Sequence, residues 1–394
     1  MSDFFRIKLP TLRSRNSGLR WLAVFSLGLF AFVSCRPDDD GNSGGTAPSP
    51  EARLCESSDH AGTPYDFDVP FFFPQPQLPG DNPMTEEGVE LGRHLFWDKK
   101  LSRNNAVSCG SCHFPGAAFS DNAQFSTGLY GEQTDRNSMA LVNLAWVNTG
   151  FFWDGRAVTL EEQILEPVEH PVEMDLTWRE AVERLEEDPE YQDMYAAAFG
   201  SPCVDSVRTV KAIAQFIRTM VSHRSKFDKW RYYGEAMLSS AEFRGMELFL
   251  AEGGEPDVIP GGQGGGDCFH CHGGDLVLFS DNIFRNNGLD SVFTDIGRAL
   301  VTGSEFDRGL FRTPTLRNIA LTAPYMHDGR FATLEEVIDH YDMAGHPSPT
   351  IDPMMKLQGI GLQLSPQDKA DLVAFLHTLT DEEFVENEAF HDPH

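Results

Sequence analysis

Two short motifs place two thiols and a histidine at a spacing that can hold a metal cofactor. They are Cys109-Gly110-Ser111-Cys112-His113 and Cys268-Phe269-His270-Cys271-His272. Thiols separated by two residues can form thioether bonds to the two vinyl groups of one haem, and the adjoining histidine then supplies the fifth iron ligand. The sequence therefore predicts two covalently bound haem c groups, with His113 and His272 as ligands to the haem iron.

A zinc site is the alternative, because Cys-x-x-Cys pairs also suit tetrahedral zinc. In a zinc ribbon the two pairs lie roughly 15–20 residues apart. Here Cys268 follows Cys109 by 159 positions, and each pair is followed directly by a histidine. The spacing therefore favours two haem sites over one zinc site.

Helices predominate among the elements that must position these motifs, and strand patterns are sparse. Helical periodicity and capping residues predict helices over residues 85–97, 160–165, 178–185, 189–199, 204–223, 239–250, 333–341 and 365–379. Long irregular segments carry the motifs themselves. We therefore expect a mainly α chain with two cytochrome c-like haem domains, 84–235 and 236–380, and an acidic tail over 381–394.

The N-terminus reads as an export segment. Basic residues precede an apolar run from Trp21 to Val33, which is too short to span a bilayer. We therefore predict a signal peptide over 1–34, and the sequence around Cys35 resembles a bacterial lipoprotein cleavage box. The mature chain would then begin at a lipidated Cys35, its only link to a membrane, in the periplasm or cell envelope, with the outer membrane as one candidate location. Ordinary signal cleavage and an uncleaved anchor are the alternatives.

A tether or arm over 35–83 follows, rich in Asp, Gly, Ser and Pro at its start, and we expect that start to be disordered. Two cysteines remain outside the haem motifs and the lipidation site, Cys55 and Cys203. Leftover thiols in an oxidising compartment favour a disulfide, although the sequence gives no distance between them. This bond would tie the arm to the first domain.

The charge of the chain limits its partners. The whole sequence carries −29, and removal of the signal segment with its five bases and one acid leaves −33. Such a surface would repel nucleic acid. The negative surface suits a basic partner, such as a small cytochrome c, which long-range electrostatics would attract. The alternative is that the charge serves only solubility.

Residues 84–380 resemble the bacterial di-haem cytochrome c peroxidase family, which includes MauG. The resemblance rests on short matches in order, namely Leu91-Gly92, Leu95-Phe96, Cys109 to His113, Arg136-Asn137-Ser138, Phe152 to Arg156, Gln163, Glu173-Met174, Cys268 to His272, Leu316 to Tyr325 and His327-Asp328-Gly329. In that family the first haem reduces peroxide, and the second relays or stores electrons.

The resemblance assigns roles around the first haem. Glu173 matches the distal glutamate that moves a proton, Gln163 matches the glutamine near it, and Pro167 matches a proline of the same pocket. The alternative for Glu173 is one surface acid among several, because Glu166 and Glu169 lie close to it in the sequence.

Two positions depart from the family pattern. Members that need reductive activation carry a histidine that blocks the first iron, where this chain has Leu129. Leucine cannot ligate iron, so we expect an open first haem without an activation step. Tyr341 stands where other members use a methionine on the second haem, as tyrosine does in MauG; Met343 is the rival ligand, and Met354 and Met355 are more distant alternatives.

The resemblance implies two further features between the haems. Trp153 matches a tryptophan that can carry electrons between them, although core packing would also explain a tryptophan there. Asn137 by its side chain, and Thr313 and Thr315 by their backbone carbonyls, match positions that hold one calcium ion.

The resemblance therefore implies an oxidoreductase of the cytochrome c peroxidase type. It would reduce hydrogen peroxide with electrons from a small c-type cytochrome or another redox partner. A MauG-like oxidase acting on a protein or small molecule is one alternative, and a non-catalytic electron carrier is another. Family members are often dimers, so a homodimer is also possible.

Overall fold

The computed structural model describes residue 55, residues 61–254 and residues 264–394. The predicted signal peptide, the lipidation site at Cys35 and most of the tether lie outside the described residues. Within the described ranges, no helix is long and apolar enough to cross a membrane. The disulfide predicted between Cys55 and Cys203 is confirmed.

The chain is mainly helical, as predicted. The helices are α1 Glu86–Trp97, α2 Cys109–Cys112, α3 Leu160–Glu169, α4 Trp178–Glu186, α5 Pro189–Phe199, α6 Ser206–Arg218, α7 Lys226–Asp228, α8 Ser240–Leu250, α9 Phe269–His272, α10 Ala299–Thr302, α11 Leu334–Asp342, α12 Pro366–His377 and α13 Glu382–Val385. The strands β1 Phe284–Arg285 and β2 Phe311–Arg312 pair antiparallel. Hydroxyl side chains cap most of the longer helices, which explains why their starts were predicted well.

The helix predicted over 204–223 is shorter in the structure. It ends at Arg218, and the residues after it, up to Ser222, are not helical. There the Asn143 side chain accepts from the Ser222 amide at 2.8 Å and donates to its carbonyl at 3.1 Å. These long-range bonds replace the helical ones, and the hydrophobic pattern alone could not reveal them.

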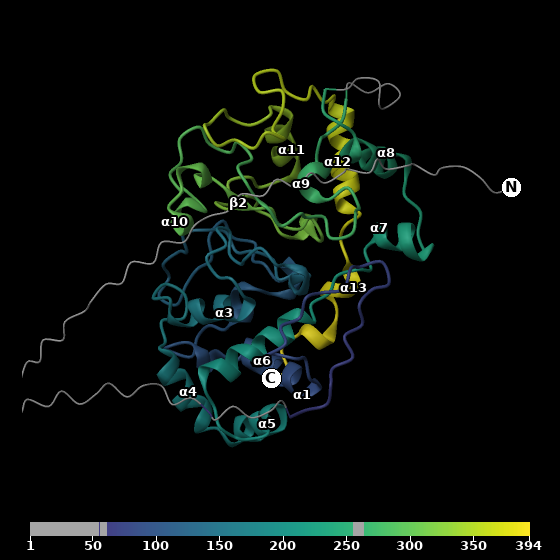
Figure 1. The fold of residues 1–394 in the computed structure, drawn as a ribbon. Coiled ribbons are helices and arrows are strands. Elements are labelled where there is room, and N and C mark those ends of the chain that lie inside the picture. Colours follow the sequence, from purple (N-terminus) through teal and green to yellow (C-terminus); the bar gives the residue numbers. More distant parts are fainter. Residues whose placement is uncertain (1–54, 56–60, 255–263) are drawn as a thin grey trace, which may run out of the picture. The chain divides into compact units, whose positions relative to one another are not determined.

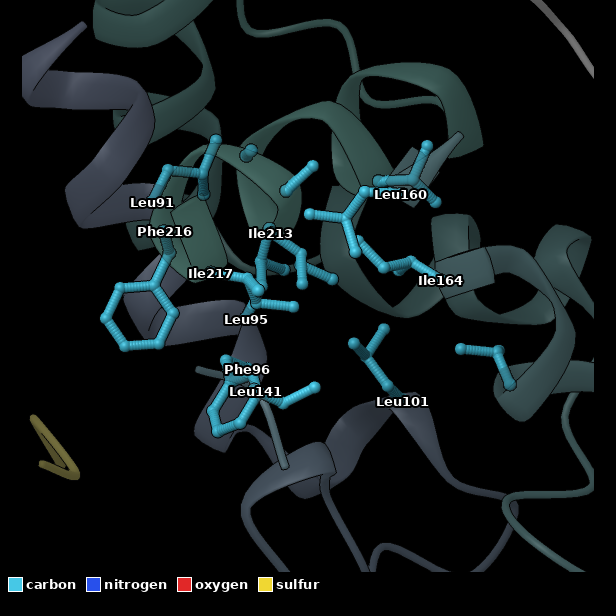
Figure 2. Packing of buried hydrophobic residues seen from close by; sticks show 14 of the residues in the cluster. Leu91, Leu95, Phe96, Leu101, Leu141, Leu160, Ile164, Ile213, Phe216 and Ile217 are labelled. Atoms are coloured by element: carbon cyan, nitrogen blue, oxygen red, sulfur yellow. The ribbon is translucent and has the colours of Figure 1, made fainter. Parts of the chain in front are cut away.

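The first core forms where α1 crosses α6 (Figure 1). Gly92 permits the close approach, since a β-carbon there would lie 1.9 Å from the Ala212 carbonyl oxygen. Leu95, Phe216 and Ile217 pack at this crossing (Figure 2). The first haem motif follows α1 directly, so this core fixes the position of the motif.

The second core repeats this arrangement with α8 and α12 (Figure 1). A β-carbon on Gly245 would lie 1.9 Å from the Asp371 carbonyl oxygen, which matches the close approach at Gly92. Phe249 and Phe375 pack edge to face at 5.4 Å beside this crossing. Each haem motif is therefore preceded by a helix that crosses a later helix at a glycine.

The predicted acidic tail, 381–394, packs against the first core. Phe384 and Phe390 are buried in it, and the Trp97 indole donates to the Phe390 carbonyl at 3.1 Å. The acidic side chains between them, such as Glu388, face solvent. After the second core, the C-terminal segment therefore packs back against the first core and completes it.

Candidate active site

The first haem motif forms one helical turn, α2, at the edge of a cavity of about 1030 Å³. Cys109 and Cys112 are free thiols and line this first cavity together with His113. The His113 ring nitrogen Nδ1 lies 2.8 Å from the Phe119 carbonyl oxygen, so Nδ1 must donate. This leaves Nε2 as the nitrogen that can ligate iron.

The second motif forms α9 at the edge of a narrower cavity of about 240 Å³. Cys268 and Cys271 are again free thiols, and His272 donates from Nδ1 to the Phe279 carbonyl at 3.2 Å. Burial lowers the pKa of His272 to about 4 and also lowers the pKa of His113, which keeps both rings in the neutral form that binds metal.

Both cavities fit a covalently attached haem by their donor sets. Each brings together two unpaired thiols and one imidazole whose second nitrogen is already fixed by a backbone carbonyl. The first cavity lies at the upper end of the 300–1,000 Å³ typical of small-molecule sites. The second cavity, about 240 Å³, lies below this range, so the donor set alone supports a haem there.

Glu173, Gln163 and Pro167 line the first cavity together with His113. Gln163 and Pro167 project from α3, and Glu173 follows in the turn after it. Burial raises the pKa of Glu173 above its ordinary value, and the nearby His170 and Arg156 oppose that rise. The His170 ring lies 3.5 Å from the Glu173 carboxylate.

The neighbouring acids have other roles. Glu166 pairs with Arg156 at 2.7 Å, and Glu169 accepts from the Trp178 amide at 3.3 Å. Neither of these acids lines the first cavity, whereas Glu173 does. The structure therefore separates three acids that the sequence alone could not distinguish.

The turn that carries Leu129 packs against the segment next to Glu173. A β-carbon on Gly128 would lie 1.7 Å from the Val172 carbonyl oxygen, and the Leu129 amide donates to the same oxygen at 3.1 Å. Thr127 and Gly128 line the first cavity, but Leu129 does not. The family resemblance predicts a blocking histidine at this position in members that need reductive activation.

The structure distinguishes the two candidate ligands of the second haem. Tyr341 lines the second cavity, and its hydroxyl accepts from the Asn287 amide at 3.3 Å. Burial raises the pKa of Tyr341 to about 12. Met343 directly follows the last residue of α11, is 59% exposed and does not line the cavity.

Other methionines also reach the second cavity. Met354 and Met355 line it, and so does Met326, which the sequence analysis did not consider. The Asn287 amide that donates to Tyr341 also donates to the Met326 sulfur at 3.4 Å. Met326 directly follows Tyr325 in the matched segment, but only the structure brings it beside Tyr341.

A set of residues lines both cavities and is called the shared wall here. It consists of Asn137, Ser138, Met139, Ala140, Leu144, Trp153, Arg312 and His327. The Trp153 indole donates to the Asn137 carbonyl at 2.8 Å, which fixes the ring within the wall. Trp153 thus contacts both candidate haem sites, as a bridging residue must.

The residues predicted to hold calcium all belong to the lining of the second cavity. Asn137, Thr313 and Thr315 all line it, and together they offer neutral oxygen atoms of the kind that calcium accepts. The Asn137 amide nitrogen donates to the Ala123 carbonyl at 3.0 Å, which leaves its oxygen for a ligand. This donor set is compatible with calcium, which stays a prediction.

One acidic group lies beside the second motif. Among the described residues, Glu252, Asp267 and His270 are the one set of three such side chains close enough to share a metal ion. The Lys356 ammonium lies 2.5 Å from Glu252 and 3.3 Å from Asp267. A cation of the chain itself therefore already occupies the centre of this group.

Comparisons with known proteins agree with this geometry. A sequence profile described as di-haem cytochrome c peroxidase matches residues 86–236. The methylamine utilization protein MauG of Methylorubrum extorquens is 34% identical over 364 residues, which cover 92% of this chain and 94% of that protein. Cytochrome c551 peroxidase of Nitrosomonas europaea is 35% identical over 302 residues, 76% of this chain and 81% of that protein.

A solved structure extends the likeness to three dimensions. The crystal structure of a MauG-like protein associated with microbial copper homeostasis aligns with a TM-score of 0.71 and 37% identity. The alignment covers 84% of this chain and 99% of that one.

Proposed function

Because the chain belongs to the di-haem cytochrome c peroxidase family, we propose that it reduces hydrogen peroxide in the first cavity with electrons relayed through the second. The observation that carries this proposal is the position of Glu173. It lines the same cavity as His113, beside Gln163 and Pro167, and burial raises its pKa toward the range useful for proton transfer.

A haem held by Cys109, Cys112 and His113 would supply redox-active iron with an open position for peroxide. In this proposal Glu173 would accept a proton from one oxygen of bound peroxide and return it to the other, which would leave as water when the O–O bond takes up two electrons supplied by the haem. The Gln163 amide orients the same pair of oxygens. Positioned acid–base groups of this kind accelerate reactions by roughly 10²–10⁴-fold.

Electrons reach the first cavity across the shared wall. A second haem would be held by Cys268, Cys271 and His272, with Tyr341 as a further ligand, in the cavity that Trp153 also lines. A calcium ion at Asn137, Thr313 and Thr315 would brace the same wall. We place the two cytochrome c-like domains at 84–235 and 236–380, and both contribute residues to the shared wall.

The donor in this proposal is a small basic c-type cytochrome outside the cytoplasm. The strong negative charge of the chain would attract such a partner. The signal segment 1–34 and Cys35 support an enzyme tethered to the cell envelope by lipid.

Steady-state turnover tests the proposal. The holoprotein, mixed with reduced small cytochrome c and hydrogen peroxide, should oxidise two cytochromes for each peroxide consumed. Fast electron exchange with the cytochrome but no peroxide-dependent oxidation would instead identify a non-catalytic electron carrier.

A MauG-like oxidase is the second candidate, and the position of Tyr341 favours it. A negatively charged oxygen ligand stabilises oxidised iron, which suits storage of oxidising equivalents on both haems. Peroxide added to the oxidised protein without a donor should then leave two equivalents stored for minutes. Back-titration with a reductant counts them, and rapid loss of both equivalents would favour the simple peroxidase.

A further inference from the structure

Arg312 is a buried cation that no carboxylate of the described chain neutralises. Only 5% of its surface is exposed. Its guanidinium donates to the Asn282 side-chain oxygen at 3.3 Å, the Phe152 carbonyl at 3.5 Å and the Met139 sulfur at 3.6 Å. These three acceptors are neutral, and all three contacts are long.

Such a site is unfavourable, because arginine stays protonated in proteins and a buried charge normally needs a partner. Arg317 is a buried arginine of the same chain that does have a carboxylate partner. It is fully buried and forms two bonds to the Asp228 carboxylate, at 2.7 and 3.0 Å. Arg312 is almost equally buried but lacks an anion of this kind.

Nearby acids do not fill this role. Asp154 and Asp295 line the first cavity, but both pair with Arg136, which lines the same cavity. Asp352 lines the second cavity and pairs with Arg285 at 2.7 Å. The anion that balances Arg312 must therefore come from outside these residues.

Arg312 belongs to the shared wall and so lines both cavities. Each haem c carries two propionate carboxylates, and the planar guanidinium has five N–H donors that match carboxylates in pairs. We propose that Arg312 is the counter-ion of haem propionates from both cavities, one cation shared by the two cofactors. This inference rests on the haem-binding part of the proposed function and is independent of peroxide chemistry.

A shared cation has a measurable consequence. A positive charge near a haem stabilises the ferrous state, so its loss lowers the reduction potential. We expect Arg312→Gln to lower the midpoint potentials of both haems by about 59 mV or more, which corresponds to a tenfold change in a one-electron equilibrium. Glutamine keeps hydrogen-bonding capacity at the wall, so the comparison isolates the charge.

Spectroelectrochemical titration of the oxidised holoprotein measures each haem without peroxide. Arg179→Gln is the matched control, because Arg179 is 59% exposed, lines neither cavity and removes the same unit of charge. Haem content is determined first; a protein without two haems contradicts the proposed function rather than this inference. If both haems load and either potential in Arg312→Gln equals that of the control, the shared role is refuted.

Arg312→Lys keeps the inference testable if the glutamine variant does not accumulate. Lysine retains the charge but cannot form a two-bonded fork to a carboxylate. The propionate bending bands in the resonance Raman spectrum should therefore shift, with both potentials kept near those of the wild type. Unchanged bands would mean that the guanidinium does not bind propionate.

Discussion

Replacement of Glu173 by glutamine tests the acid–base role most directly. The glutamine keeps the size of the side chain and its place in the first cavity but cannot transfer the proton. General acid–base assistance is worth roughly 10²–10⁴ in rate. We therefore expect kcat/KM for peroxide to fall by about this factor, equivalent to about 2.7–5.5 kcal/mol of transition-state stabilisation.

The stability of the variant should be nearly unchanged. The Glu173 carboxylate contacts His170 at 3.5 Å, and these side chains keep 35% and 43% exposure. Partly exposed pairs of this kind contribute roughly 0.2–1 kcal/mol. Burial disfavours the ionised carboxylate, so a neutral glutamine offsets part of that loss at neutral pH.

The pH profile gives a second readout. Glu173 must be ionised to accept a proton, and burial raises its pKa. Activity should therefore rise with pH through a value above the ordinary glutamate pKa, and this acid limb should disappear in Glu173→Gln.

Stopped-flow turnover of the holoproteins with peroxide and reduced cytochrome provides the assay, with Glu169→Gln as the control. Glu169 is the last residue of α3, does not line the first cavity and accepts a hydrogen bond from the Trp178 amide. A Glu173→Gln rate within threefold of the wild type, or an equal loss in the control, would refute the reasoning.

The remaining predictions concern electron transfer, ligation and stability. Trp153→Phe should slow electron transfer between the haems in flash-reduction kinetics, whereas a packing role alone would leave the rate unchanged. Tyr341→Met should raise the potential of the second haem, and Met343→Leu should not change it in the same titration. We predict that Leu129 leaves the first iron open, so the EPR spectrum of the oxidised protein should contain a high-spin haem signal; low-spin signals alone would contradict this. Asp228→Asn leaves a buried guanidinium unpaired and should destabilise the protein by about 3–5 kcal/mol in urea unfolding, compared with under 1 kcal/mol for an exposed acid.

Local patterns in the sequence determined much of this protein. Covalent haem attachment depends on cysteines and a histidine within five residues, so both motifs could be identified directly. Hydroxyl caps and hydrophobic periodicity are equally local, and the helix predicted over 189–199 agrees with α5 residue for residue. The Cys55–Cys203 bond could be predicted by elimination, because the four motif cysteines were assigned to haem and Cys35 to the predicted lipidation site.

Only the tertiary structure decided which distant residues meet. The sequence offered Tyr341 and Met343 two positions apart, and the packing of α11 turned one toward the second cavity and the other to solvent. Trp153 and Arg312 are far apart in the chain, yet both belong to the wall between the cavities. The proposed counter-ion role of Arg312 depends on its burial and on the lack of a carboxylate partner among the described residues. Both are set by the elements packed around Arg312, and no local sequence pattern shows them.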